Sequence, residues 1–141
     1  MFGAVGKEAN AIAAGKRMLS SMTPTVVLKN KKPYLVVGTP GGTTIPTSVF
    51  QTLVNIIEFN QSPIDAVNHP KFHHQWLPDQ VAIENDFPFS TQTALSNMGY
   101  TFQKRNQIGR TEVIKINWEG KKIKNIEAVA DKRGDDHAAA Y

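Results

Sequence analysis

Apolar and polar residues alternate along this chain with two different periods, which predict strands and helices. Runs rich in β-branched and aromatic residues flank an Asn-Lys-Lys turn at 30–32 and a Glu-Gly-Lys-Lys turn at 119–122. Each pair of runs predicts an antiparallel hairpin. Shorter extended segments are expected within 71–76, 80–85 and 100–105. The continuously apolar run Leu35–Val37 predicts a strand buried on both faces.

Steps of three and four residues between apolar positions predict one long amphipathic helix from 44 to 59. Its apolar positions are Ile45, Val49, Leu53, Ile56 and Ile57. Thr43 or Thr44 can cap this helix, and Pro46 suits its first turn.

Two shorter helices are marked by their ends. Ser62 is a cap for a helix that has Pro63 in the first position and ends before Pro70. The segment "FSTQTALSNMG" predicts a helix capped by Ser90 and closed by Gly99. About six strands and three helices give an α+β class, an antiparallel sheet packed with helices. A length of 141 residues suits a single domain over 1–141, with the Gly- and Ala-rich residues 1–19 irregular.

The composition of the chain excludes several kinds of site and segment. The absence of cysteine excludes disulfides, thiolate zinc sites and cysteine nucleophiles. No segment reaches the roughly 20 apolar residues of a membrane span, and the first 15 residues lack the apolar core of a signal peptide. The net charge is +4, with lysines clustered at 29, 31, 32 and at 121, 122, 124. Solvated turns are favoured over a nucleic-acid patch, because no aromatic residues interleave with these lysines.

The stretch "VVGTPGGTTIPTSV" places Gly41 and Gly42 between a predicted strand and a helix start. Glycine lets a ligand approach the peptide N–H, and N–H groups at a helix start attract anions. The turn could therefore hold a phosphate, a carboxylate or the oxyanion of acyl transfer. A tight turn that needs glycine for sterics alone is the alternative, and spacing alone favours it slightly. The Rossmann and P-loop patterns are absent.

Ser20 and Ser21 are adjacent hydroxyls in a predicted loop before the first strand. Two hydroxyls and their N–H groups can hold a carboxylate. An ordinary serine turn is the alternative, which spacing alone favours. No Gly-x-Ser-x-Gly elbow surrounds them, which argues against a serine nucleophile.

Three histidines, His69, His73 and His74, lie close enough in sequence to suggest zinc. Pro70 breaks any helix that would align them, and no carboxylate stands at a ligand spacing. No metal and no cofactor are therefore expected. The C-terminal "DKRGDDHAAAY" by itself indicates a solvated tail that tucks Tyr141 against the body.

Several runs together resemble the small subunit of γ-glutamyltranspeptidases, the glutathione hydrolases. They are "KRMLSSMTPT", "PYLVVGTPGGTTI", "AVNHPKFHHQWLPD", Gly109-Arg110 and "ADKRGDDHAAAY". The resemblance implies an N-terminal-nucleophile hydrolase with a four-layer αββα sandwich, of which this chain would be one truncated half. It also implies γ-glutamyl compounds such as glutathione as substrates, a self-cleaving precursor, and a periplasmic or extracellular location.

In that family a new N-terminal Thr attacks the γ-glutamyl amide, and its own α-amine can serve as base. The resemblance implies that the N–H groups of Gly41 and Gly42 form the oxyanion hole. It implies that Ser20 and Ser21 help to hold the α-carboxylate of the glutamyl group. The acyl group then passes to water, an amino acid or a peptide.

The family's nucleophile lies in a Thr-Thr-His-like segment well upstream of the Ser-Ser motif, and none of the 19 residues before Ser20 fits it. The chain is therefore expected to be the C-terminal part of a small subunit, an excised piece or the product of a truncated reading frame. It would need the large subunit and the rest of the small subunit, and is expected inactive alone. Uncovered sheet edges and apolar faces would favour a homo-oligomer. The alternative is a non-catalytic anion-binding or dimerisation module, and a nucleic-acid binder is disfavoured.

Overall fold

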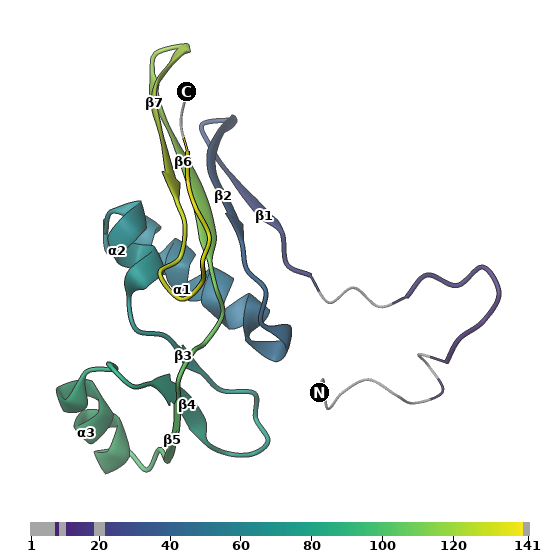
Figure 1. The fold of residues 1–141 in the computed structure, drawn as a ribbon, viewed down its shortest axis with the longest axis vertical. Coiled ribbons are helices and arrows are strands. Elements are labelled where there is room, and N and C mark those ends of the chain that lie inside the picture. The colour runs from purple at the N-terminus through teal and green to yellow at the C-terminus, as the bar shows by residue number, and fades with distance from the viewer. Residues whose placement is uncertain (1–7, 9–10, 19–21, 140–141) are drawn as a thin grey trace.

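The computed structural model describes residues 8, 11–18 and 22–139. Its larger sheet is antiparallel and has the strand order β1-β2-β6-β7. The strands are β1 (Thr25–Lys29), β2 (Lys32–Gly38), β6 (Glu112–Glu119) and β7 (Lys122–Val129). Both predicted hairpins are confirmed, and they lie side by side in this sheet (Figure 1).

Two helices cover one face of the larger sheet. Helix α1 (Ile45–Ile57) contacts β2, and α2 (Pro63–Asn68) contacts β6 and β7. The hydrophobic core lies between these two helices and the sheet. Its buried members are Leu35, Val37, Val49, Ile56, Ala66, Val67 and Val113. The period of three and four that predicted α1 therefore marks the helix face turned to the sheet.

The opposite face of the larger sheet carries exposed apolar side chains. The cross-strand neighbours Val36 and Ile114 are 38% and 42% exposed, whereas Leu35 and Val37 are buried. The prediction that Leu35–Val37 is buried on both faces is therefore wrong. Successive side chains of a strand point to opposite faces, and the described helices cover only one of them.

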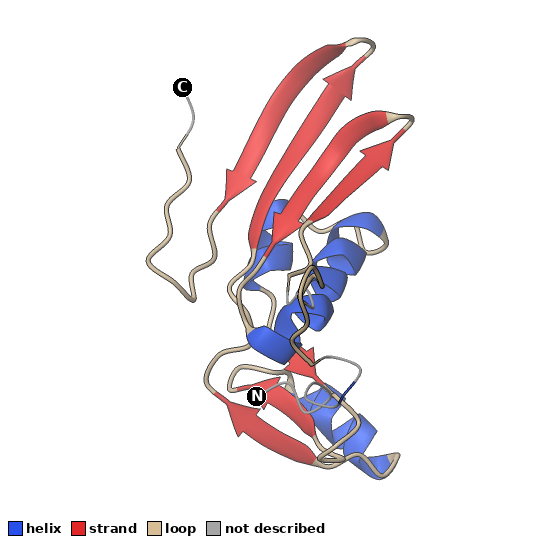
Figure 2. Ribbon diagram, turned by 90° about the vertical axis from the view of Figure 1, so that its right-hand side faces the viewer, coloured by secondary structure: helices blue, strands red, loops and turns tan. Residues whose placement is uncertain are grey.

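A smaller sheet has the order β3-β4-β5 (Figure 2). Its strands are β3 (Phe72–His73), β4 (Val81–Glu84) and β5 (Phe102–Arg105). Strands β3 and β4 are antiparallel, as expected, but β4 and β5 are parallel, which was not predicted. Parallel neighbours need a crossover, and α3 (Phe89–Asn97) supplies it. The chain thus contains seven strands and three α-helices within its described residues, against about six and three predicted.

The helix starts show where capping chemistry was predicted correctly. Ser62 caps α2, because its Oγ accepts a hydrogen bond from the backbone N–H of Asp65 at 3.2 Å. Ser90 does not cap α3, so that prediction is wrong. The helix begins one residue earlier, at Phe89, with Pro88 at the cap position and no side-chain capping bond.

Helix α1 also connects the two sheets. The side chain of Gln51 donates to the carbonyl of Phe72 at 2.7 Å and accepts from its N–H at 3.1 Å. This two-way bond satisfies an edge residue of β3 from the helix that also supports the core of the larger sheet. No described helix combines the length and apolarity needed to cross a membrane.

Candidate active site

The glycine turn follows β2 directly. The chain leaves the strand at Gly38 and enters a 3₁₀ helix, η2 (Gly42–Thr44), that continues into α1. Gly41 has φ 147° and Gly42 has φ 61°, and L side chains rarely adopt either conformation. A Cβ at Gly41 would stand 2.5 Å from Thr44 Oγ1. The predicted strand, turn and helix start are confirmed, and glycine is sterically required at Gly41.

In this turn the Gly41 carbonyl is hydrogen-bonded, whereas two backbone N–H groups are not. The carbonyl of Gly41 accepts from the Thr44 N–H at 3.2 Å and from Thr44 Oγ1 at 2.9 Å. Thr44 therefore holds the turn and makes no side-chain capping bond to α1. The N–H groups of Gly41 and Gly42 donate no hydrogen bond to any described residue. Two backbone donors at a helix start are thus left for another acceptor.

A second glycine packs against this turn from the loop before β6. Gly109 has φ 70°, and a Cβ there would stand 2.5 Å from Ser48 Oγ and 3.1 Å from Thr39 Oγ1. The next N–H, of Arg110, donates to Thr39 Oγ1 at 2.8 Å. In the sequence, Gly109-Arg110 counted only as part of a resemblance. Its steric reason, close contact with the start of α1, is visible only in three dimensions.

The two glycine segments share a cavity of about 450 Å³. Its wall is formed by Pro40, Gly41, Thr44, Arg105, Gln107, Gly109 and Arg110. Arg110 is held by Asp136 at 2.9 Å and Asp135 at 3.8 Å, whereas Arg105 forms no ion pair with any acidic side chain in the described part of the chain. The cavity therefore carries a cationic side chain beside the backbone donors, a setting that favours an anion.

Ser20 and Ser21 lie outside the described residues. The described chain resumes at residue 22 and enters β1 at Thr25. Thr25 is paired with Val37, one residue before the end of β2. The antiparallel pairing thus brings the start of β1 to the same end of the sheet as the glycine turn.

A buried ionic cluster lies behind the Gly109 loop. Arg133 contacts the carboxylate of Glu84 through Nε at 2.7 Å and Nη2 at 2.6 Å, and its Nη1 lies 3.0 Å from Asp131 Oδ1. The Arg133 and Asp131 side chains are 8% and 0% exposed. The prediction of a solvated tail is therefore wrong for Asp131 and Arg133, whereas Lys132 between them is exposed. The two charges are buried because the fold supplies partners from segments distant in the sequence.

The carboxylates of this cluster also bind backbone N–H groups. Glu84 accepts from Lys71 at 2.8 Å and from Ile108 at 2.9 Å, and Asp131 accepts from Thr111 at 2.7 Å. These bonds fix both ends of the segment that contains Gly109. The cluster therefore positions one wall of the cavity, although it does not line the cavity.

Three pKa values are shifted in this cluster. Burial alone would lower the pKa of Arg133, but the hydrogen bonds and charges of Glu84 and Asp131 outweigh burial and raise it. Burial and the nearby charge of Arg133 lower the pKa of Lys71 to about 8, although Asp131 lies only 3.8 Å from its Nζ. Burial alone would raise the pKa of Glu84. The hydrogen bonds from Arg133 and from two backbone N–H groups outweigh burial and hold that pKa below its ordinary value.

The histidines take part in ordinary hydrogen bonds. His73 Nδ1 lies 2.9 Å from Thr47 Oγ1, and its Nε2 lies 3.1 Å from Gln75 Oε1. His74 Nε2 lies 3.1 Å from Asp79 Oδ1. The described residues contain no group of three His, Asp or Glu side chains arranged to hold a metal ion.

The mixed α+β fold matches part of solved structures of N-terminal-nucleophile hydrolases. A mutant γ-glutamyltranspeptidase of Helicobacter pylori superposes with a TM-score of 0.85 at 43% identity, over 92% of this chain and 70% of that one. The Pseudomonas nitroreducens enzyme complexed with L-DON gives a TM-score of 0.84 at 39% identity, over 99% and 72%. These structures define the class of the fold.

The family profile "Gamma-glutamyltranspeptidase" matches residues 1–141. The chain is 39% identical to the glutathione hydrolase proenzyme of Escherichia coli over 100% of its own length and 24% of that protein. It is 42% identical to the Pseudomonas aeruginosa proenzyme over 94% and 24%. The chain belongs to the γ-glutamyltranspeptidase family, and it spans about a quarter of the length of these relatives.

Proposed function

We propose that this chain supplies the acyl-stabilising part of a γ-glutamyl-transferring enzyme that acts on compounds such as glutathione. The N–H groups of Gly41 and Gly42 hold the oxyanion, and Ser20 and Ser21 help to hold the glutamyl α-carboxylate. The observation that carries the proposal is the pair of backbone donors without a described acceptor, at a cavity that Gly41 lines. The pairing of Thr25 with Val37 supports the role of the serines, because β1, the strand that follows them in the sequence, starts beside this turn.

The chemistry needs a nucleophile from a segment outside this chain. A threonine hydroxyl adds to the γ-carbonyl carbon and gives its proton to an amine base, and the carbonyl oxygen becomes an anion. Collapse of this intermediate forms an ester and expels the amine, which takes up the proton. Water or a second amine then attacks the ester. Each addition places negative charge where the two glycine N–H groups stabilise it.

We infer that the larger sheet is one layer of an αββα sandwich. The exposed apolar face of Val36 and Ile114 supports this, because such a face is stabilised by a second sheet. The large subunit and the rest of the small subunit supply that layer and the nucleophile. The isolated chain is therefore inactive, and the complete enzyme acts in the periplasm or outside the cell.

A chimera tests the proposal most directly. This chain replaces the matching quarter of the E. coli glutathione hydrolase proenzyme, and release of the chromogenic amine from a γ-glutamyl anilide is measured. The chimera is expected to be active. Gly41→Ala should lower kcat by about 100-fold or more, because the new Cβ displaces an oxyanion donor. Gly38→Ala is the matched control, because its Cβ meets no atom within 4 Å.

Two outcomes contradict the proposal in different ways. If Gly41→Ala and Gly38→Ala retain equal activity in a processed chimera, the proposed role of the Gly41 N–H in holding the oxyanion is wrong. If the isolated chain releases the amine by itself, the proposed need for an external nucleophile is wrong.

A further inference from the structure

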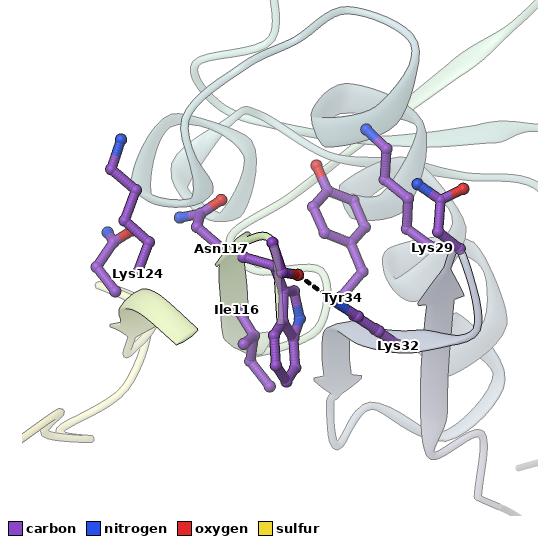
Figure 3. A pocket seen from close by; sticks show the side chains of 10 residues that line it. Lys29, Lys32, Tyr34, Ile116, Asn117 and Lys124 are labelled. Carbon is purple, nitrogen blue, oxygen red and sulfur yellow. Dashed lines mark hydrogen bonds between the residues drawn. The ribbon is translucent and has the colours of Figure 1, made fainter. Parts of the chain in front are cut away.

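The two hairpins of the larger sheet separate at their tips. Pairing between β2 and β6 runs from Gly38–Glu112 to Leu35–Lys115 and stops there. Both ribbon views show the tips apart (Figures 1 and 2). A cavity of about 630 Å³ lies between them, which we call the hairpin cleft (Figure 3). Cavities of about 300–1,000 Å³ are typical of small-ligand sites.

Two hydrogen bonds join the hairpins across the cleft. Trp118 Nε1 donates to the carbonyl of Pro33 at 2.7 Å, and Lys32 Nζ donates to the carbonyl of Gly120. Each bond links the β1–β2 hairpin to the β6–β7 hairpin where the strands no longer pair. The cleft thus has walls tied together by side chains.

Aromatic rings hold lysines at this cleft. Lys32 Nζ lies 4.9 Å from the centre of the Trp118 ring, and Lys29 Nζ lies 5.2 Å from the centre of the Tyr34 ring. No aromatic residues interleave with these lysines in the sequence, but the fold places the rings of Tyr34 and Trp118 beside Lys29 and Lys32. Trp118 is distant from Lys32 along the chain, and only the β2–β6 pairing brings them together.

The charge of the cleft is one-sided. Lys29, Lys32 and Lys124 line it, and no acidic residue does so in the described chain. Lys31, Lys121 and Lys122 lie at the same tips but do not line the cavity. The nearest acidic groups are Glu119, at the end of β6, and Glu127, which accepts a hydrogen bond from Asn117 Nδ2 at 2.6 Å, and neither lines the cavity. Cations that line one cavity repel each other, and a polyvalent anion between them relieves this repulsion.

We propose that the hairpin cleft binds a ligand with two or more adjacent phosphate groups. Lys29 and Lys124 contact the phosphates from opposite hairpins, and Lys32 remains fixed between Trp118 and Gly120. A multiply charged anion fits better than a single carboxylate because three ammonium groups line one cavity. The site is distinct from the glycine turn, which lies at the other end of β2, about 20 Å away for a seven-residue strand.

Trp118 reports the binding by fluorescence. The chain has two tryptophans, so Trp76→Phe leaves Trp118 as the only indole. In that background, inorganic tripolyphosphate is expected to change the fluorescence saturably. Lys29→Gln with Lys124→Gln should raise the Kd at least tenfold. Lys31→Gln with Lys121→Gln is the matched control, because it removes equal charge from the same tips without altering the cavity wall. This control should change the Kd less than threefold.

A lipid is the other source of the same chemistry. Vesicles that contain cardiolipin, a lipid with two phosphate groups, and vesicles of phosphatidylcholine are compared for cosedimentation with the same variants. Binding in the tripolyphosphate arm, or to the cardiolipin vesicles alone, supports the proposal when it follows the Lys29 and Lys124 pattern, and the positive arm identifies the source. Equal loss in both double variants, or no saturable binding in either arm, overturns it. If a double variant does not fold, Lys124→Glu, a single change on an exposed strand, replaces it. This variant should also weaken the binding, and unchanged binding would overturn the proposal.

Discussion

The guanidinium of Arg133 contacts the carboxylate of Glu84 at two points, with Nε–Oε1 at 2.7 Å and Nη2–Oε2 at 2.6 Å. Both side chains are buried, at 8% and 3% exposed. Arg133 also donates to the carbonyls of Val67 and His69 at 2.9 and 3.0 Å. One side chain therefore joins the end of β4, the end of α2 and the segment after β7.

Replacing Arg133 with Met should cost about 3–5 kcal/mol of the free energy of unfolding, because Glu84 would remain charged and buried without its partner. Arg133→Lys should rescue only part of this loss, since an ammonium cannot make the two-point contact. Urea unfolding followed by circular dichroism measures both. The exposed neighbour Lys132→Met is the control, expected within about 0.5 kcal/mol of the parent. Equal stability of the Arg133 and Lys132 variants would contradict this role.

Lys71 predicts a pH dependence in the alkaline range. Its pKa is about 8 in the folded chain against an ordinary 10.5. Below pH 8 the group is charged in both states, so the cost of burying that charge is fully present. Between pH 8 and 10.5 the unfolded chain binds the proton and the folded chain has released it. Stability contributed by Lys71 therefore rises with pH in this window, by at most about 1.4 kcal/mol per pH unit.

The difference between the parent and Lys71→Met isolates this effect from other titrating groups. The free energy of unfolding of the parent minus that of the variant should increase from pH 8 to pH 10. It should be constant from pH 6 to pH 7. A difference that is flat up to pH 10 would show that the pKa of Lys71 is not lowered.

The close packing of Gly109 against Ser48 and Thr39 predicts that a side chain at Gly109 lowers stability by steric overlap, in addition to any cost of its positive φ. Gly109→Ala and Gly120→Ala both place Ala at positive φ, 70° and 57°, but only the Gly109 Cβ meets neighbours. Gly109→Ala should therefore lose more stability, by about 1–3 kcal/mol, as an overpacked site does. Thermal unfolding compares the two.

Ser48 offers a rescue of that clash. Its buried Oγ has no hydrogen-bond partner among the described residues and would stand 2.5 Å from the new Cβ of Gly109→Ala. Ser48→Ala alone should be neutral or slightly stabilising, because it removes an unsatisfied buried hydroxyl. Ser48→Ala added to Gly109→Ala should recover part of the loss. Additive losses in the double variant would show that the two groups are not in contact.

The exposed face of the larger sheet predicts self-association of the isolated chain. At tens of micromolar the mass in solution should exceed that of a monomer, because apolar side chains such as Val36 and Ile114 are uncovered. Val36→Thr with Ile114→Thr keeps β-branched residues in the strands and should shift the mass toward the monomer. Phe89→Gln on α3 removes an apolar group that is more exposed, at 80%, but lies away from this sheet, and it should not shift the mass. A parent chain that is strictly monomeric at this concentration would contradict the prediction.

Local patterns predicted the elements whose signals lie within a few residues. Both hairpins, the long helix α1 and the Ser62 cap follow from residue periodicity and turn chemistry. The parallel pairing of β4 and β5 was missed, because no local pattern states which strand the chain joins after a helix. The predicted cap Ser90 was wrong because capping preference is only one contribution to where a helix begins, and α3 begins after Pro88.

The sequence by itself determined the family and most of the elements, since both depend on residue identity or near neighbours. It left the glycine turn open between steric need and an anion site, and the structure decided the need for glycine at Gly41. The tertiary structure alone decided that Gly109 packs on the glycine turn, that Arg133 is buried against Glu84, and that Trp118 meets Lys32. These contacts join residues far apart in the chain. The charge, size and spacing of residues along the sequence do not show which distant residues meet. The pairing of β2 with β6 and the packing of α2 bring these residues together.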